Sequence, residues 1–210
     1  ALSDEEIIQL SRLGRPDDPD TGLVGYWPFN GKDIVGTTAY DRSGKGNNGT
    51  LTNSPTKTIG KSGQGMNFDG TDDYVDLGTG LSLANLEPMT ISAWQYIDPT
   101  TNMFETIVDK TDVGAVTYLG LSSIWSAPSG RLIFNAKFDG GVLTRVTAGG
   151  VLTTGEWQYV VMTWDGSTSA SNVHIYVDGT EAPSYIQTTD GSGARSDDSA
   201  VNLTVGGRQH

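Results

Sequence analysis

Short strand-like segments recur along most of the chain and restrict the folds that it can adopt. From Gly22 onward, segments rich in Val, Ile, Thr and aromatic residues are separated by turns of Gly, Asn and Asp, about every ten to fifteen residues. This spacing is typical of an antiparallel β-sandwich and not of βαβ units. We predict strands at residues 23–29, 65–68, 74–77, 89–97, 105–109, 116–121, 131–138, 142–146, 157–164, 173–177 and 203–205.

Alternation within these segments indicates which side chains face the interior. His174 and Tyr176 alternate with apolar neighbours, which places His174 on an exposed sheet face, and the Asp-Gly pair at 178–179 predicts a hairpin. The tryptophans at 27, 94, 157 and 164 are expected in the core. The predicted core also contains Leu23, Phe29, Phe68, Val75, Ile91, Ile133, Val160, Met162, Val173, Ile175 and Val177.

The first 21 residues differ from the rest of the chain. Ser3 is a good helix N-cap, Glu6 completes a capping box, and Gly14 ends the apolar stripe, so residues 1–14 are predicted to form a short helix. Residues 15–21, rich in proline and aspartate, are expected to form a stiff polar linker. One domain would then occupy residues 22–210.

Composition excludes several classes of protein. The absence of cysteine removes thiol nucleophiles, disulfides and thiolate metal sites, and two histidines cannot build a multi-histidine metal site. A net charge of -12, from 13 basic and 25 acidic side chains, opposes binding to nucleic acids and anionic membranes. No apolar run reaches the roughly 18 residues of a membrane span. No signal peptide is recognisable, so we expect the chain to be either cytoplasmic or already processed.

Six motifs, taken in order, resemble one known family. They are GLVGYWPFN at 22–30, TTAYDRSGKGNNGTL at 37–51, FDGTDDYV at 68–75, TISAW at 90–94, WQYVVMTWDG at 157–166 and IYVDG at 175–179. This series is similar to the LamG-like (concanavalin A-like lectin/glucanase) domain of bacterial and phage surface proteins. The resemblance implies an all-β fold, a concanavalin A-like jelly-roll sandwich of two antiparallel sheets. It leaves the function open, because this fold hosts lectins, adhesins, spacers and glycosidases.

One departure from the family concerns its last strand. Similar domains have a further strand after the Val-Gly-Gly segment, which here stands at 205–207, close to the last residue of the sequence. Two interpretations stay open. The sequence is a fragment of a tandem array, with residues 1–14 the tail of the preceding repeat, or a neighbouring chain supplies the strand. An unfilled slot would expose backbone donors and apolar side chains, which favours pairing with another chain.

An acidic, amide-rich turn at 41–49 is the best candidate for a metal site. Carboxylates, amides and backbone carbonyls are the ligands that Ca²⁺ prefers, and three glycines would let the carbonyls converge. The resemblance implies one structural Ca²⁺ here, with Asp41 as the carboxylate ligand and Asn47 or Asn48 as the amide ligand. Asn30 stands where the family often has an acid. The alternative is a turn capped by its own side chains.

Sugar binding would require exposed aromatic rings, and the sequence offers two candidates. Trp125 lies in a predicted loop at 122–130, and Tyr185 follows the predicted hairpin. The alternative is that both rings fold onto the edge of the sandwich. The polar segment 188–199 is predicted to be a long exposed loop, and 68–74 a tight turn rather than a cation site.

No catalytic apparatus is recognisable in the sequence. Glycoside hydrolysis usually needs two facing carboxylates roughly 5–10 Å apart, and the Glu-x-Asp-x-x-Glu string of the glucanase branch is absent. We therefore predict a non-catalytic, extracellular or cell-surface recognition module that binds a glycan or surface polymer and holds a structural calcium. The alternative is a structural repeat or subunit of a surface array or filament, which self-associates through the open strand slot.

Overall fold

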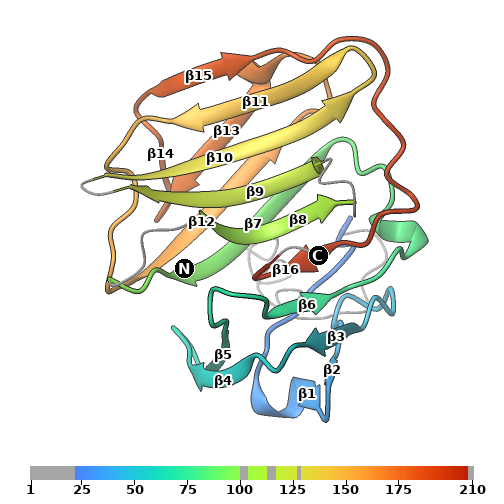
Figure 1. Ribbon diagram of the computed structural model, residues 1–210, viewed down its shortest axis with the longest axis vertical. Coiled ribbons are helices and arrows are strands. Elements are labelled where there is room, and N and C mark those ends of the chain that lie inside the picture. Colours follow the sequence, from blue (N-terminus) through green and yellow to red (C-terminus); the bar gives the residue numbers. More distant parts are fainter. Residues whose placement is uncertain (1–21, 100–103, 113–116, 127–128, 208–210) are drawn as a thin grey trace, which may run out of the picture.

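The computed structural model describes residues 22–99, 104–112, 117–126 and 129–207. They form a sandwich of two main antiparallel β-layers (Figure 1). Helical structure in this part of the chain is limited to three 3₁₀ turns, Gly31–Asp33, Leu81–Leu83 and Ala170–Asn172. None of these turns has the length and apolar character needed to cross a membrane. The predicted helix at 1–14 and linker at 15–21 lie outside the described residues.

One layer is a ten-stranded sheet and the other a four-stranded sheet. The ten-stranded sheet has the order β1 (Ile34–Val35), β2 (Thr38–Ala39), β3 (Gly49–Thr52), β6 (Tyr74–Asp76), β16 (Thr204–Val205), β8 (Phe104–Thr111), β9 (Thr117–Ser126), β10 (Ser129–Phe138), β11 (Gly141–Thr147) and β15 (Tyr185–Thr189). The four-stranded sheet has the order β14 (Thr180–Glu181), β13 (Val173–Val177), β12 (Trp157–Trp164) and β7 (Met89–Tyr96). A separate hairpin pairs β4 (Thr56–Ile59) with β5 (Gln64–Asn67).

Most predicted strands are confirmed, because alternation and turn chemistry agree at those positions. The strands β12 and β13 have the predicted bounds, and Asp178 and Gly179 form the predicted hairpin turn with φ values of 50° and 79°. The strands β1 to β4 were not expected from the sequence. The strand β9 also runs further than predicted, to Ser126, so Trp125 lies in a strand and not in a loop.

The predicted strand at 23–29 is wrong, since these residues are irregular. Their backbone groups bond to a neighbouring loop instead of a strand ladder: the Tyr26 N–H donates to Asp41, and the Tyr26 carbonyl accepts from the Arg42 N–H. Phe29 adopts a positive φ of 55°, which a strand does not accommodate. The segment 22–30 is therefore an extended coil beside the sandwich.

The interior is divided into two apolar clusters. The larger one lies between the four-stranded sheet and strands β8 to β11, and contains Leu121, Phe134, Met162, Trp164 and Ile175. The smaller one contains Val75, Leu77, Leu83 and Leu203, and the partly buried Trp27 packs against it from the coil. The coil and the β4–β5 hairpin thus cover the part of the large sheet that the small sheet leaves open (Figure 1).

The predicted core is correct for Val75, Val160, Met162, Val173 and Ile175, which are all fully buried. Other predicted core residues are only partly buried but pack against a cluster: Trp27, Phe29, Phe68, Ile91 and Val177. Four assignments are wrong, and one of them is Trp157, which is partly buried on the outer face of β12. Leu23 is 40% exposed because 23–29 is not a strand, and Trp94 is 46% exposed because it lies on the outer face of β7. Ile133 is out of phase with its buried neighbours Leu132 and Phe134.

The segment 188–199 is not the exposed loop that its polarity predicts. Its first residues belong to β15, and Ser196 and Asp198 are buried, with exposed fractions of 6% and 1%. Asp198 accepts a hydrogen bond from the fully buried Lys110. The hydrogen bond to Lys110, in a strand distant in the sequence, therefore accounts for the burial of Asp198.

Candidate ligand-binding site

Four aromatic side chains gather on the outer face of the four-stranded sheet, the face turned away from the large sheet. In β7 the exposed Thr90, Ser92, Trp94 and Tyr96 alternate with Met89, Ile91 and Ala93, which pack against the core. The strand β12 aligns with β7 so that Tyr159 is opposite Trp94 and Trp157 is opposite Tyr96. We call these four aromatic residues the aromatic platform.

The platform consists of two contacting ring pairs. The ring centroids of Trp94 and Tyr159 lie 5.1 Å apart, and those of Tyr96 and Trp157 lie 5.7 Å apart, both pairs tilted. Trp94 and Tyr96 are each 46% exposed. Aromatic pairs in this geometry hold each other in position, so the platform presents a rigid apolar surface to solvent.

A basic side chain lies over one end of the platform. Lys61 follows β4, and its Nζ is 5.2 Å from the centre of the Trp94 ring, a cation–π contact. The β4–β5 hairpin therefore supplies a hydrogen-bond donor and a positive charge beside an exposed aromatic face. This combination of an apolar floor and few polar groups is typical of ligand sites.

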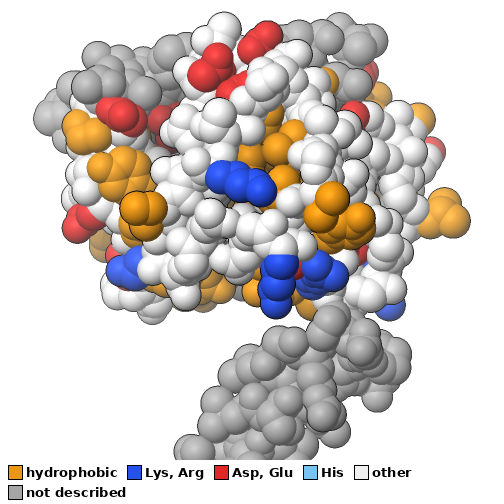
Figure 2. Space-filling model, turned by 90° about the horizontal axis from the view of Figure 1, so that it is seen from below, with side chains coloured by type: hydrophobic (Ala, Val, Ile, Leu, Met, Phe, Trp, Pro, Cys, Tyr) orange, Lys and Arg blue, Asp and Glu red, His pale blue; other side chains and the backbone are white. Residues whose placement is uncertain are grey.

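An open cleft of about 2370 Å³ adjoins the platform. Residues of β7 and of the coil 22–30 line it, together with Lys61 and the four aromatic residues of the platform. Seen from the end that carries β1 to β5, apolar side chains are visible inside a hollow with a basic side chain across it (Figure 2). The platform and the cleft together are the candidate functional site.

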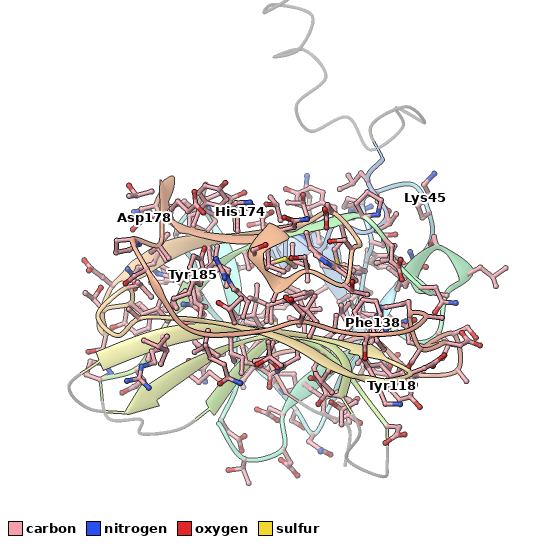
Figure 3. All side chains as sticks on the ribbon, turned by 90° about the horizontal axis from the view of Figure 1, so that it is seen from above. Lys45, Tyr118, Phe138, His174, Asp178 and Tyr185 are labelled. Atoms are coloured by element: carbon pink, nitrogen blue, oxygen red, sulfur yellow. The ribbon has the colours of Figure 1, made fainter. Side chains whose placement is uncertain are left out.

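Of the two aromatic residues predicted to bind sugar, Tyr185 is partly buried and packs against the larger core cluster. It lies between the two layers (Figure 3), and its hydroxyl accepts a hydrogen bond from the Ile175 N–H at 3.0 Å. The guanidinium of Arg145 stands 3.6 Å from the centre of its ring, and burial raises the pKa of its phenol. Tyr185 thus connects the sheets. Trp125 pairs through its backbone with Gly130 in the β9–β10 hairpin.

The predicted metal ligands Asp41, Asn47 and Asn48 form one hydrogen-bonded turn. One Asp41 oxygen accepts from the N–H groups of Tyr26 and Ser43, at 2.9 and 2.8 Å. The other accepts from the Ser43 hydroxyl at 2.7 Å and the Asn47 N–H at 2.9 Å. The Asn48 side-chain oxygen accepts from the Asp41 N–H, and the Asn47 amide donates to the Val24 carbonyl. Asp41 therefore attaches the coil 22–30 to this loop.

These residues, as arranged, do not fit a calcium ion. Four N–H or O–H donors already occupy the two Asp41 oxygens, and the Asn48 oxygen has a donor as well. The Asn30 side-chain oxygen accepts from the Gln64 N–H at 3.0 Å and is not part of this network. Calcium ligands must offer free oxygen lone pairs that converge on one point. The hydrogen bonds therefore favour the alternative interpretation, a turn capped by its own side chains, and structural calcium at this loop stays a prediction.

We expect Asp41→Ala to lower the free energy of unfolding at pH 7 by about 1–3 kcal/mol, because it leaves backbone donors without acceptors. Burial raises the pKa of Asp41, but hydrogen bonds from Ser43, Tyr26 and Asn47 outweigh it and hold the pKa below its usual value. The stabilisation is therefore present above the unfolded-state pKa of about 3.9 and is lost as the pH falls through the lower folded-state value. Urea denaturation from pH 7 to pH 2 measures it.

Ser43→Ala is the matched control for this prediction, since it removes one donor to Asp41 and should have a smaller effect. Melting with added calcium or with a chelator separates the two roles of Asp41. A melting temperature that rises with calcium in the wild type but not in Asp41→Ala would show that the carboxylate binds the ion, and would contradict the purely hydrogen-bonded role.

Three glutamates and the histidine of the described chain have structural partners. Glu87 lies near Arg195, Glu156 accepts from the Thr153 hydroxyl, and Glu181 pairs with His174. His174 is on the outer face of its sheet, as predicted (Figure 3). The acidic residues Asp69, Asp72 and Asp73 lie within 4.8 Å of one another in the turn before β6. The Thr71 N–H donates to Asp69 and lowers its pKa, so the segment forms a turn between β5 and β6, and the absence of a cation there stays a prediction.

Sequence reasoning missed the aromatic platform. Alternation in β7 does place Trp94 and Tyr96 on one face, and that signal was available. It does not tell which face of a strand the second layer covers. The structure answers this, because Met89, Ile91 and Ala93 are the residues that contact the core.

Comparison with known proteins identifies the family. The sequence profile described as the concanavalin A-like lectin/glucanases superfamily matches residues 69–210, which is more than half of the chain. The chain belongs to this superfamily. The superfamily's β-sandwich accounts for the two layers, and its name covers both lectins and glucanases, so membership does not decide between binding and catalysis. No curated protein matches the sequence.

The solved structures that resemble this chain are distant from it in sequence. The carbohydrate-binding module CBM66 from Bacillus subtilis is similar at 13% identity and a TM-score of 0.42, over 75% of this chain and 87% of that one. An alginate lyase from Pseudomonas aeruginosa is similar at 13% identity and a TM-score of 0.33, over 83% of this chain and 85% of that one.

Proposed function

We propose that this domain is a non-catalytic recognition module that binds glycans on its aromatic platform, at an extracellular or cell-surface location. The observation that carries the proposal is the two ring contacts on the outer face of the sheet, in which the exposed Trp94 and Tyr96 pack on the partly buried Tyr159 and Trp157. A sugar ring has an apolar C–H face that packs on an aromatic ring, and hydroxyl groups that need polar partners at the edge. An exposed apolar patch with a polar rim marks an interaction site.

The dimensions of the platform suit an oligosaccharide better than a single sugar. Trp94 and Tyr96 are two positions apart on β7, which corresponds to about 7 Å along a strand. Two sugar rings in sequence could each pack on one aromatic pair. Lys61 and the exposed Ser92 would then bind hydroxyl or carboxylate groups at the edge of the same face.

The non-catalytic part of the proposal rests on the carboxylates. The described glutamates at 87, 156 and 181 have basic or hydroxyl partners, and Asp69 is engaged by the turn before β6. A glycosidase needs one carboxyl group free to protonate the leaving oxygen and a second to act as nucleophile or base. The partners of these groups favour a structural role for each of them.

The test is a glycan array of neutral and uronate-containing oligosaccharides, followed by calorimetry on the best ligand. We expect Trp94→Ala and Tyr159→Ala each to weaken binding by at least about tenfold, equivalent to about 1.4 kcal/mol. Ile186→Ala removes an exposed apolar side chain from β15, away from the platform, and should leave affinity unchanged. Wild-type affinity in both platform variants, or no array binding by the wild type, would contradict the proposal.

A second candidate function is supported by a different observation. The strand β7 is the last strand of its sheet and pairs only with β12 among the described residues. A subunit of a surface array or filament, completed by a strand from a neighbouring chain, would use such an edge. In that case the purified chain should self-associate, and light scattering as a function of concentration would show it.

A further inference from the structure

The cleft beside β7 has the properties of a slot for one extended polypeptide strand. Along its eight residues β7 bonds only to β12 in the described structure, and no other backbone hydrogen bond involves it. In an antiparallel pair about half of the N–H and C=O groups point away from the partner. The free edge of β7 therefore offers a row of backbone donors and acceptors to the cleft.

The coil 22–30, which also lines the cleft, is held in place by hydrogen bonds to a neighbouring loop. In the coil 22–30, Tyr26 bonds to Asp41 and Arg42, and the Val24 carbonyl accepts from the Asn47 amide at 2.7 Å. These contacts fasten the coil to the loop 41–48. A strand that enters the cleft would thus find the free edge of β7 and this fixed coil among the groups that line it.

The floor of the slot is apolar. Val108 packs against both core clusters, and Val205 and Phe68 pack against the smaller one, while all three side chains line the cleft and stay partly exposed. Ile91 and Ala93 of β7 line it as well. An inserted strand with apolar residues at alternate positions would direct that face onto this floor and cover it.

One end of the slot is acidic. The residues Asp69, Asp72 and Asp73 line the cleft there, together with Asp98, which follows β7. The register places them toward the Tyr96 end: Val75 pairs with Val205, which pairs with Val108, so β6 and β8 run in the same direction and the turn before β6 lies toward the start of β8. The strand β8 is the next strand after β7 in the chain, and in Figure 1 it starts where β7 ends.

We propose that this slot binds a single β-strand of another polypeptide, antiparallel to β7, with apolar residues at alternate positions and a basic N-terminal end. All strand pairs in the described structure are antiparallel, which sets the expected direction. The N-terminal end of the bound strand then lies beside Tyr96 and the acidic residues, where Lys or Arg gains charge complementarity. The binding mode is β-strand addition. Strand binding in the slot does not require a glycan. It would provide the contact between subunits on which the second candidate function rests.

The test uses a fluorescein-labelled peptide, Lys-Arg-Val-Thr-Val-Thr-Val-Thr-Val, and its reversed sequence, which has the same composition and charge. Fluorescence anisotropy with the whole chain should show the first peptide binding at least tenfold more tightly than the reversed one. A third peptide, N-methylated at alternate residues, keeps the side chains but cannot complete the ladder and should not bind. Equal binding of the forward and reversed peptides, or retained binding of the methylated one, would overturn the proposal, and so would no binding of the forward peptide.

Variants of the protein connect the binding to the slot. Asp69→Asn/Asp72→Asn keeps hydrogen-bond acceptors in the turn but removes two charges, and should reduce the preference for the forward peptide to less than threefold. Tyr159 also lines the cleft but belongs to β12, one strand in from the free edge of β7, so Tyr159→Ala should lower peptide affinity by less than about threefold. Loss of peptide binding in Tyr159→Ala but not in the aspartate variant would place the peptide on the platform and overturn the assignment to the slot.

Discussion

Asp198→Ala should lower the free energy of unfolding by about 3–5 kcal/mol, since it leaves buried positive charge without its partner. The Asp198 side chain is 1% exposed, and Lys110 beneath it is fully buried. The Lys110 Nζ donates to one carboxylate oxygen at 2.7 Å and to the Asp198 backbone carbonyl at 3.2 Å. The Arg195 guanidinium donates to the other carboxylate oxygen at 2.9 Å. The single carboxylate thus serves two cations.

The matched control is Asp197→Ala, one position earlier in the chain. Asp197 is exposed, and it accepts hydrogen bonds from Ser199 and Asn85 at the surface, so its loss should change stability by less than about 1 kcal/mol. Urea denaturation at pH 7 measures both variants. The double variant Lys110→Met/Asp198→Ala should be more stable than Asp198→Ala, because it no longer contains an unpaired buried ammonium group. A double variant that is less stable than the single one would contradict this account.

The buried position of Asp198 could not be predicted from the sequence. Lys110 and Asp198 are 88 residues apart, and nothing local to 188–199 indicates a partner. A polar segment without apolar residues is normally solvated, and for most of its residues that expectation holds. Long-range charge pairing decides the exception, and it becomes visible only when the fold brings β8 beside this segment.

The overall architecture was accessible from the sequence because the relevant signals are local. Strands such as β12 and β13 combine alternation with β-branched and aromatic residues, and a glycine turn separates β13 from β14. The segment 23–29 is also rich in apolar and aromatic residues. Its backbone, however, forms hydrogen bonds with the side chains of Asp41 and Asn47 in a loop later in the chain. Whether such a segment forms a strand depends on which backbone or side-chain groups are available to pair with it. For 23–29 these groups belong to a turn and not to a neighbouring strand.

The site was less accessible than the fold. The sequence predicts a metal site in the turn at 41–49, whereas the hydrogen bonds of Asp41 show it joining the coil to the loop. Tyr185 was selected as an exposed ring, yet it bonds across the two layers. Both choices depended on which groups lie nearby in space, and residue type alone does not give that.

Trp164→Ala should lower the free energy of unfolding by about 3–5 kcal/mol, while Trp94→Ala should lower it by less than about 1 kcal/mol. Both tryptophans lie in strands of the same sheet, and the sequence predicts both to be core residues. Trp164 is 2% exposed and its ring lies 5.7 Å from that of Phe134 and 6.1 Å from that of Phe138, centre to centre. Its indole N–H donates to the Ser167 carbonyl at 2.9 Å. Removal therefore leaves a cavity and a carbonyl without its donor.

Removal of the Trp94 side chain should not leave a cavity in the core, because its ring faces solvent and contacts Tyr159 and Lys61. Urea denaturation and tryptophan emission test the contrast together, because loss of a buried indole should remove blue-shifted emission and loss of an exposed one should remove red-shifted emission. Equal destabilisation by the two variants would mean that the platform is part of the core. If only Trp164→Ala is destabilised, the exposed aromatic rings are not required for folding, and a loss of glycan affinity in Trp94→Ala reports on binding.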